Sequence, residues 1–491
     1  MAKSMFLPKA KAARIDEASL SILEKTGLRL DHPEAEELLL DAGASRDSEG
    51  RILIPRKLVW DALYKVSHRV QLYTREGKKA ILLRTGRTYF GPGSDALYNI
   101  DRRTGQLRFS TLEDVRENVR VVNSLAGFDF MMSMGLPSEV ESHRLYATVF
   151  AEMVKNTVKP IVATATTLED VQQIHRIAAM AVGGEEELRS KPFFIAYLEP
   201  NSPLYADRSS TERLLYCAEQ QIPFLYAAGA NIGVTAPISL AGAVAQGNAE
   251  SLFGLVLATL KNENVRFVLG SNSSSADMSY GKVLYGAPEW FKTVAMYADM
   301  GRFYGLPTWG TGGCSDAHCI DAQAGFEAYE GILLSCQSGP TMVHDVGYLS
   351  YGFLYDVRMV VLANEIIRRA RHLTSVIDVD EESESAQAID EVARGRWGYG
   401  SFLDHPHTAA HFRKNLWLPP RFIQRKMVHA GIFPNELYER LTEEVGNILA
   451  TNQPAALKPG RLRAIDEYVE SLSGYQGRYE AGGGALQAEI G

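Results

Sequence analysis

The sequence predicts a (β/α)8 barrel of the TIM-barrel type, an α/β fold, with helical additions at its N-terminal and C-terminal ends. From about residue 112, the 491-residue chain alternates buried-looking strands with amphipathic helices, which is the pattern of successive βα units. Polar and Gly-rich loops follow these strands, as they do at the catalytic mouth of a barrel. The first of them lacks the Gly-rich phosphate loop that is typical of a doubly wound sheet, so a barrel is favoured.

Residues 1–110 are expected to form a flank of helices and short strands packed on the barrel. Helical periodicity covers 10–27, 33–42 and 55–66, each ended or opened by Gly or Pro. Short strands are expected at 70–73, 80–83 and 88–90, and the last leads into the loop Gly91-Pro92-Gly93-Ser94-Asp95.

Residues 111–380 are expected to form the barrel itself. The predicted strands are 128–134, 160–166, 192–198, 222–228, 266–270, 306–311 and 340–344. Helices between them begin near Thr111, Val140, Leu168, Ser209, Pro237, Gly286 and Asp321. The best candidate for an eighth strand is Ser375–Val379. Residues 381–472 are expected to form a C-terminal helical layer, and 473–491, rich in Gly and Ala, a loose tail.

The composition is that of a globular enzyme-sized domain. The chain is 46% hydrophobic with a net charge of −8, which argues against binding to nucleic acid or to an anionic membrane. The most apolar stretch, 238–260, is broken by Gln246, Asn248 and Glu250, so no membrane span is predicted. Four cysteines without a secretory pattern indicate a reducing cytoplasm, and a homo-oligomer is the default expectation.

Two polar clusters, each placed where an apolar run stops, are the candidates for the barrel mouth. The first, 310–321, holds Asp316 and follows Trp309; the second, 344–349, begins with His344. His344 precedes an aromatic-rich loop and could face a ligand, although a histidine bonded within the barrel wall is equally compatible with its position. An aromatic mouth with few cationic groups would suit a cationic ligand, because ring faces attract ammonium groups.

A zinc site is the main metal hypothesis. Cys314, His318 and Cys319 could supply a tetrahedral set, with Cys336 beyond them. Their spacing is not an established one, and neighbouring ligands on a helix point in different directions, so no metal is expected there. His407 and His411 share one helical face but lack a visible third ligand, and packing is the better interpretation.

Segments spread over about 200 residues together resemble the trimethylamine methyltransferase family, corrinoid-dependent enzymes of (β/α)8 architecture. They are 229–237 with the helix 240–260, Gly270-Ser271 with Asp277-Met278, 286–289, 313–327, 344–349, and His407-Thr408 with 411–413. Founding members of that family carry pyrrolysine. This chain has only standard residues, and it is therefore similar to the non-pyrrolysine branch, which demethylates quaternary amines such as glycine betaine, proline betaine and carnitine.

The resemblance implies an activity, a cofactor and a set of site residues. The activity would move a methyl group from glycine betaine or a related betaine to cob(I)alamin, giving methylcobalamin, on a small cognate corrinoid protein. No residue of the chain would act as a covalent catalyst. His344 would hold the substrate carboxylate, and the ammonium cage would draw on Tyr98, Trp309, Tyr348 and Phe353. Asp316 would steer the cation or cap a helix, with Glu199 as a further candidate.

Two other functions remain open from the residues alone. One is a zinc-dependent barrel methyltransferase or hydrolase that uses the Cys314 cluster, and the other is a barrel that binds amines without turnover.

Overall fold

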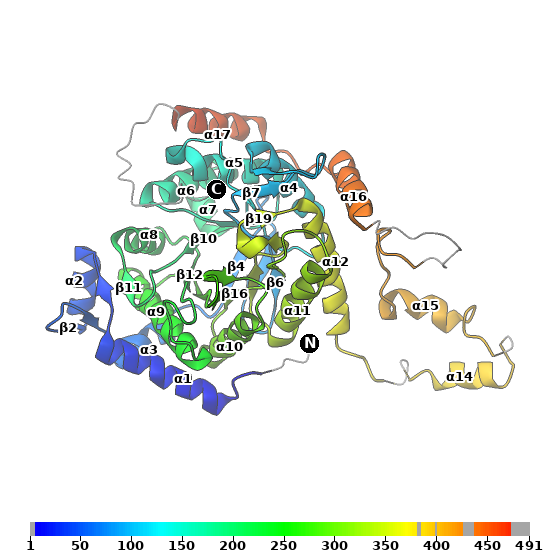
Figure 1. The fold of residues 1–491 in the computed structure, drawn as a ribbon, viewed down its shortest axis with the longest axis horizontal. Helices are drawn as coiled ribbons and strands as arrows, with labels where there is room; N and C mark the ends of the chain where they lie inside the picture. Colours follow the sequence, from blue (N-terminus) through cyan, green and yellow to red (C-terminus); the bar gives the residue numbers. More distant parts are fainter. Residues whose placement is uncertain (1–4, 381–383, 398–399, 426–436, 473–491) are drawn as a thin grey trace.

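The centre of the molecule is a closed barrel of parallel strand segments wrapped by helices (Figure 1). The computed structural model describes residues 5–380, 384–397, 400–425 and 437–472. Around the barrel the segments are β6 (Tyr89–Phe90), a bridge at Met131, β9 (Ile161–Ala163), β10 (Phe194–Leu198), β12 (Phe224–Ala228), β13 (Phe267–Ser271), β16 (Trp309–Thr311) and β17 (Met342–His344). The predicted (β/α)8 fold is confirmed.

The strand β6 closes the barrel. On one side it pairs in parallel with β17, with Tyr89 opposite Met342. On the other side the N–H of Asp129 donates to the carbonyl oxygen of Phe90 at 2.7 Å. The first strand of the barrel therefore comes from the stretch that was expected to flank it.

The prediction of an eighth strand at Ser375–Val379 is wrong. These residues follow the last barrel helix, α12 (Val357–Leu373), and form no strand. Val376, Ile377 and Val379 are 69%, 83% and 77% exposed, so their β-branched side chains, which suggested a strand, pack against no sheet.

The barrel helices alternate with the strands, and most of them begin at a side-chain cap. They are α4 (Leu112–Ser124), α5 (Leu145–Asn156), α6 (Leu168–Val182), α8 (Arg208–Glu219), α9 (Leu240–Lys261), α10 (Pro288–Tyr304), α11 (Ala322–Ser338) and α12, with the short α7 (Glu185–Ser190) after α6. Thr111 opens α4 with a capping box, since its side chain accepts from the N–H of Asp114 and the Asp114 side chain accepts in return. Thr167 and Asp170 repeat this arrangement at α6, which satisfies N–H groups that the helix itself cannot.

A hairpin plugs the N-terminal end of the barrel. It consists of β4 (Val70–Tyr73) and β5 (Lys79–Leu83), whose apolar side chains pack with those that fill the barrel interior, including Trp309. Because this end is sealed by packed side chains, a ligand can reach the barrel only from the opposite end.

The remaining N-terminal elements cover the outside of the barrel. The helices α1 (Lys9–Ser21), α2 (Pro33–Asp41) and α3 (Arg56–Lys65) pack on α9, and a π-helical turn, η1 (Ile22–Thr26), continues α1. Two small pairs of strands complete this flank: β1 (Arg29–Leu30) with β11 (Tyr205–Ala206), and β2 (Ser45–Arg46) with β3 (Ile52–Leu53). Among the described residues, no helix is both apolar and long enough to cross a bilayer.

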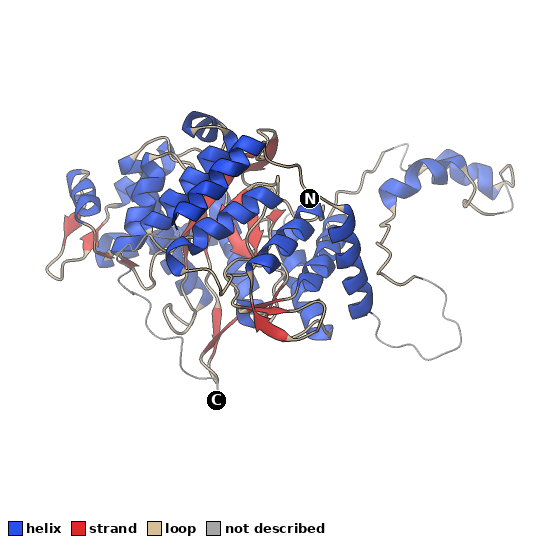
Figure 2. Ribbon diagram, turned by 90° about the horizontal axis from the view of Figure 1, so that it is seen from above, coloured by secondary structure: helices blue, strands red, loops and turns tan. Residues whose placement is uncertain are grey.

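The C-terminal helices divide into two groups. The helix α16 (Leu437–Thr451) packs on α4 and α12, and α17 (Pro459–Ser471) packs on α5 and α6. In contrast, α14 (Ala386–Ala393) and α15 (Pro406–Asn415) project away from the barrel in both views (Figures 1 and 2). Residues 419–425, which belong to the predicted C-terminal helical layer, form no helix. The predicted tail lies outside the described residues.

Small strands gather over the C-terminal end of the barrel. One sheet joins β18 (Tyr348–Leu349), β19 (Leu354–Tyr355), β7 (Tyr98–Ile100) and β8 (Leu107–Phe109); a separate hairpin joins β14 (Ser275–Asp277) and β15 (Lys282–Leu284). Short 3-10 turns lie at Ser142–Arg144 and Ser350–Gly352.

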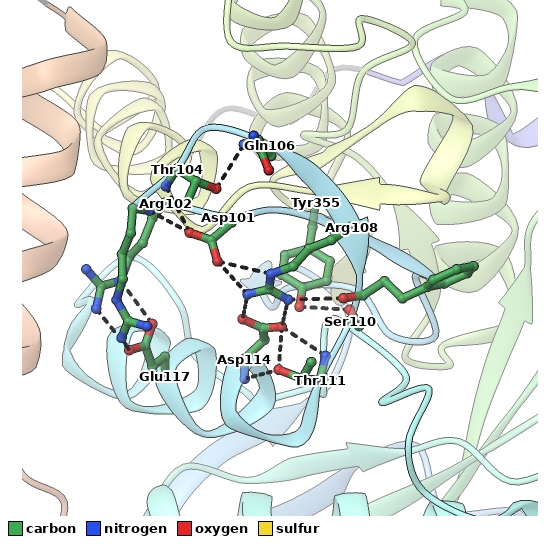
Figure 3. Close-up of polar contacts among 12 residues, drawn as sticks. Asp101, Arg102, Thr104, Gln106, Arg108, Ser110, Thr111, Asp114, Glu117 and Tyr355 are labelled. Carbon is green, nitrogen blue, oxygen red and sulfur yellow. Dashed lines mark hydrogen bonds and ion pairs between the residues drawn. The ribbon is translucent and has the colours of Figure 1, made fainter.

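An ionic network ties that sheet to α4. Arg108 of β8 donates to both Asp101 and Asp114, as Figure 3 shows. Burial acts to raise the pKa of Asp101, but hydrogen bonds from the backbone of Arg103 and Thr104 and from Arg108 outweigh it and lower that pKa to about 2. The network holds β7 and β8 beside the barrel mouth.

Candidate functional site

A cavity of about 400 Å³ opens at the C-terminal ends of the barrel strands. Its polar wall comes from the ends of successive strands: Ser94 and Asp95 after β6, Thr164 after β9, Tyr197 and Glu199 at β10, Gly229 and Asn231 after β12, Asn272 and Ser274 after β13, and His344 and Asp345 at β17. The remaining lining residues are mostly aromatic. Residues distant in the sequence thus meet at one place because parallel strands end on the same side.

Asp95 is held by two neutral donors. Its carboxylate accepts from the Ser94 hydroxyl at 3.0 Å and from the Thr164 hydroxyl at 3.1 Å. The backbone of Asp95 has a φ of 69°, in the left-handed region that Asp tolerates better than most residues. Burial raises the pKa of Asp95 to about 6, against the effect of the two hydroxyl groups and with a contribution from Glu199.

Glu199 is a second acid with neutral partners. Its Oε1 accepts from the Tyr197 hydroxyl at 2.5 Å and from the Asn272 amide at 3.1 Å. Burial raises the pKa of Glu199, and the two hydrogen bonds together with the charge of Arg213 oppose the shift only in part. An arrangement of this kind fixes the orientation of the carboxylate without neutralising it.

His344 and Asp345 form a closely spaced pair. Nδ1 of His344 lies 3.1 Å from the carbonyl oxygen of Gly310, which can only accept, so Nδ1 carries the hydrogen. Nε2 lies 3.2 Å from Oδ2 of Asp345. Burial lowers the pKa of His344 to about 3, and burial together with Asp95 and Glu199 raises that of Asp345. Both pKa shifts favour a neutral imidazole whose Nε2 accepts a hydrogen bond from a protonated Asp345.

Aromatic rings complete the cavity. They are Tyr197, Tyr285, Trp290, Tyr348, Tyr351 and Phe353. The Tyr348 hydroxyl donates to the carbonyl oxygen of Met134, and the rings of Tyr285 and Trp290 meet edge to face at 4.5 Å. These contacts fix the rings of Tyr348, Tyr285 and Trp290 in place, and aromatic faces can attract an ammonium group.

The structure brings four of the predicted site residues to this cavity: His344, Tyr348, Phe353 and Glu199. Their predicted roles stay proposals.

The other three predicted site residues do not line this cavity. Tyr98 stacks on Phe109 in the sheet beside the mouth, with ring centroids 4.9 Å apart. Trp309 is fully buried in the barrel interior, 4.3 Å from the ring of His344, so it supports the pocket wall from behind. Asp316 accepts from the N–H groups of Tyr285 and Gly286, and the helix cap at α11 is Asp321.

Asp95 is the most important residue that the sequence analysis did not place in the site. The loop 91–95 follows a barrel strand, but Tyr89–Phe90 is too short to be identified as one by periodicity. Assigning β6 to the barrel would have placed Asp95 at the mouth by the same rule that placed His344 there.

The candidate zinc ligands do not converge. Cys314 is buried with its Sγ 3.1 Å from the carbonyl oxygen of Tyr285, whereas Cys319 is exposed and His318 bonds Ser350. Burial also raises the pKa of the Cys314 thiol, which disfavours a thiolate. Within the described ranges, no cluster of three or more His, Cys, Asp or Glu side chains has the geometry to hold a metal ion.

Comparison with known proteins gives a consistent result. A family model described as trimethylamine methyltransferase (MTTB) matches residues 1–473. The chain is 29% identical over 471 residues to the trimethylamine methyltransferase MttB of Desulfitobacterium hafniense strain DCB-2, covering 94% of this chain and 93% of the relative. It is 25% identical over 480 residues to the glycine betaine methyltransferase of D. hafniense strain Y51, covering 97% and 98%. Among solved structures, the monomethylamine methyltransferase MtmB of Methanosarcina barkeri aligns over 96% of this chain and 95% of its own, with 12% identity and a TM-score of 0.48.

Proposed function

The chain belongs to the trimethylamine methyltransferase family, and from this premise we propose that it moves a methyl group from a quaternary amine of the glycine betaine type to the cob(I)alamin of a small partner corrinoid protein. The observation that carries the proposal is the cavity at the barrel mouth. It combines a cage of aromatic rings with the carboxylates of Asp95 and Glu199, and no lysine or arginine is among the residues that line it. Both features favour a permanently charged ammonium group.

In this reaction the protein has to hold the amine and orient one of its methyl groups for transfer. A quaternary nitrogen already carries a positive charge and leaves as a neutral tertiary amine, so the leaving group needs no acid. The partner's corrinoid supplies the nucleophile. The rings hold the ammonium group and exclude water, the fixed carboxylates face its charge, and one methyl group is aimed toward the open side of the cavity.

Exposed apolar side chains form a rim around the cavity and support the proposal that a partner protein docks there. Val234, Ile238, Met278, Tyr280 and Phe353 are 49% to 79% exposed. Val234 and Ile238 lie in the loop that contributes Asn231 to the cavity wall, and Met278 and Tyr280 lie in the hairpin next to Ser274 and Val283. Phe353 lines the cavity itself. Exposed apolar groups around an active-site mouth are typical of a docking surface, and a partner seated on them would cover the cavity.

The test of the proposed function is an anaerobic assay of the purified chain with cob(I)alamin, followed by the absorbance of methylcobalamin. Trimethylamine, glycine betaine, proline betaine, carnitine and choline are compared. Methyl transfer is expected from a quaternary amine and not from trimethylamine. If no amine gives methylcobalamin, and the same result is obtained with the cognate corrinoid protein, the proposal is excluded.

The docking surface has its own test. Tyr280→Asp places a charge on the apolar rim, and the KM for the corrinoid protein is expected to rise about tenfold, while transfer to free cob(I)alamin changes far less. Tyr64→Asp is the matched control, because Tyr64 lies on α3 and is 89% exposed. Equal slowing with both methyl acceptors would contradict a docking role for the rim.

A homo-oligomeric state and a cytoplasmic location stay predictions from the sequence.

A further inference from the structure

We propose that the cavity selects a quaternary ammonium compound that carries no carboxylate, with a hydroxyl or another neutral polar group in its place. The inference deepens the proposed function and rests on it, since it names the class of amine at the same site. It keeps the quaternary amine and the methyl transfer of the proposed function and replaces its betaine with an amine that lacks the carboxylate. The argument concerns the charges and hydrogen-bond donors that a bound ligand would meet.

The cavity holds three acids, of which Asp345 is protonated in its pair with His344, so the negative charge lies on Asp95 and Glu199. Asp95, Glu199 and Asp345 come from three different strand ends and line one cavity. The hydrogen-bond partners of Asp95 and Glu199 are hydroxyl and amide groups, which carry no charge. Burial of ionised carboxylates without a cationic partner is costly, and a ligand with a net positive charge would offset that cost.

A zwitterionic betaine fits this environment poorly. Its ammonium group would be favoured by the acids, but its own carboxylate would lie a few ångströms away among the same acids, and like charges at such sites cost several kcal/mol. Several donors of the cavity wall are already used, and those that remain, such as the indole N–H of Trp290, carry no charge. Tyr197 and Asn272 donate to Glu199, and Ser274 donates to Asn231.

His344 does not offer the missing positive charge. Its Nδ1–H donates to the carbonyl oxygen of Gly310, and its Nε2 faces Asp345 rather than the open cavity. To bind a carboxylate, the imidazole would have to become charged in a buried position or lose one of these contacts. A hydroxyl group makes no such demand, because it can donate to a carboxylate and accept from a neutral donor.

In the described part of the chain, two cations lie near the cavity. Arg213 acts on Glu199 but is not among the lining residues, and its guanidinium donates to the carbonyl oxygens of Ala165 and Ser209. The second lies at the rim. The ammonium group of Lys282, on β15, is 5.7 Å from the centroid of the Tyr351 ring and is exposed to solvent. Solvent screens its charge, so it compensates the buried acids little. It is nevertheless the group that a betaine carboxylate could reach if the ligand lay with its tail toward the opening, and the experiment includes it.

Choline and glycine betaine are the probes, because both carry a trimethylammonium group and differ at the terminal carbon. Isothermal titration of the full-length protein, without corrinoid, measures binding apart from catalysis. Choline is expected to bind roughly 100-fold more tightly than glycine betaine, which corresponds to the cost of placing one like charge in the site. Equal affinities, or tighter binding of glycine betaine that is lost in Lys282→Ala, would overturn the inference.

Glu199→Gln tests the source of the selectivity. The glutamine oxygen can still accept from Tyr197 and Asn272, so the wall should keep its shape while losing one charge. The affinity for choline is expected to fall about tenfold and that for glycine betaine to hold or rise. Glu186→Gln, an exposed residue of α7, is the matched control. Choline binding that survives Glu199→Gln unchanged would overturn the assigned role of this acid.

Catalysis separates this inference from the proposed function. Methyl transfer from glycine betaine but not from choline would overturn the inference and leave the proposed function intact. Selective choline binding without methyl transfer from any quaternary amine would support the charge selection and overturn the proposed function.

Discussion

Replacing Asp95 by asparagine is expected to raise the melting temperature of the ligand-free protein above pH 7 and to lower kcat/KM for the quaternary amine about 100-fold. Asn retains the shape of the side chain and tolerates the φ of 69° at this position. The hydroxyl groups of Ser94 and Thr164 can rotate to accept from the new amide as well as donate to it. The substitution therefore removes a charge without opening a hole.

The two effects have opposite signs for a physical reason. Burying the ionised carboxylate of Asp95 destabilises the empty site, whereas the same negative charge stabilises a bound cation. Burial raises the pKa of Asp95 from 3.8 to about 6, so the folded protein favours its protonated form. The associated stability is present below about pH 4 and is lost as the pH rises to about 6, a loss of about 3 kcal/mol at 1.36 kcal/mol for each pKa unit. Asparagine never ionises and avoids that loss. Cation binding favours the ionised form and should weaken as the pH falls through 6.

The measurements are a thermal melt and a kcat/KM profile from pH 5 to pH 8. The other acids that face Asp95, Glu199 and Asp345, are unchanged in the variant, so any pH dependence that remains in Asp95→Asn belongs to them. Asp41→Asn, at the exposed end of α2, is the control and should leave both curves in place. A variant that melts below the wild type at pH 8, or that keeps its kcat/KM, would show that Asp95 is not an uncompensated acid facing the substrate.

The sequence predicted the barrel well where the elements are long. Helices such as α4 and α6 carry both a clear periodicity and a capping box, and strands such as β12 are continuous apolar runs, so local patterns identify them. The strand β6 was expected as a short strand at 88–90, but two residues are too few to identify it as part of the barrel. They belong to the barrel because β17 and the backbone at Asp129 form hydrogen bonds with them, and only the tertiary structure shows these contacts.

Site residues could be predicted from the sequence only where the strand that carries them could be recognised. His344 and Glu199 could be expected at the mouth because each follows a recognisable strand. Trp309 shows the limit of that rule: within a strand, side chains alternate between the interior and the outside, and a position at the end of the strand does not say which side the ring takes. Asp95 was missed because β6 was not assigned to the barrel, and its role as an acid without a cationic partner depends on Thr164, Glu199 and Asp345 from three other strand ends.

Replacing Gly93 by alanine is the second change with a large expected effect. Gly93 lies in the loop that leads from β6 to Asp95, and a Cβ at this position would lie under 3.0 Å from the ring of Tyr348 and from Oδ1 of Asp345. Neither side chain can move away from the added methyl group. Tyr348 is 2% exposed with its hydroxyl bonded to Met134, and Asp345 is 5% exposed with a φ of 62°.

Gly93→Ala is therefore expected to destabilise the protein by about 1 to 3 kcal/mol, the usual cost of overpacking, and to abolish methyl transfer by moving the ring and the acid that line the cavity. The melting temperature and quaternary amine binding would be measured on the same preparation. Gly446→Ala in α16 is the matched control, because its Cβ would meet nothing within 4 Å, and it should add up to about 1 kcal/mol of stability. If Gly93→Ala melts with the wild type and still binds the amine, the loop after β6 does not pack against the cavity wall, and the placement of Asp95 in the site would have to be abandoned with it.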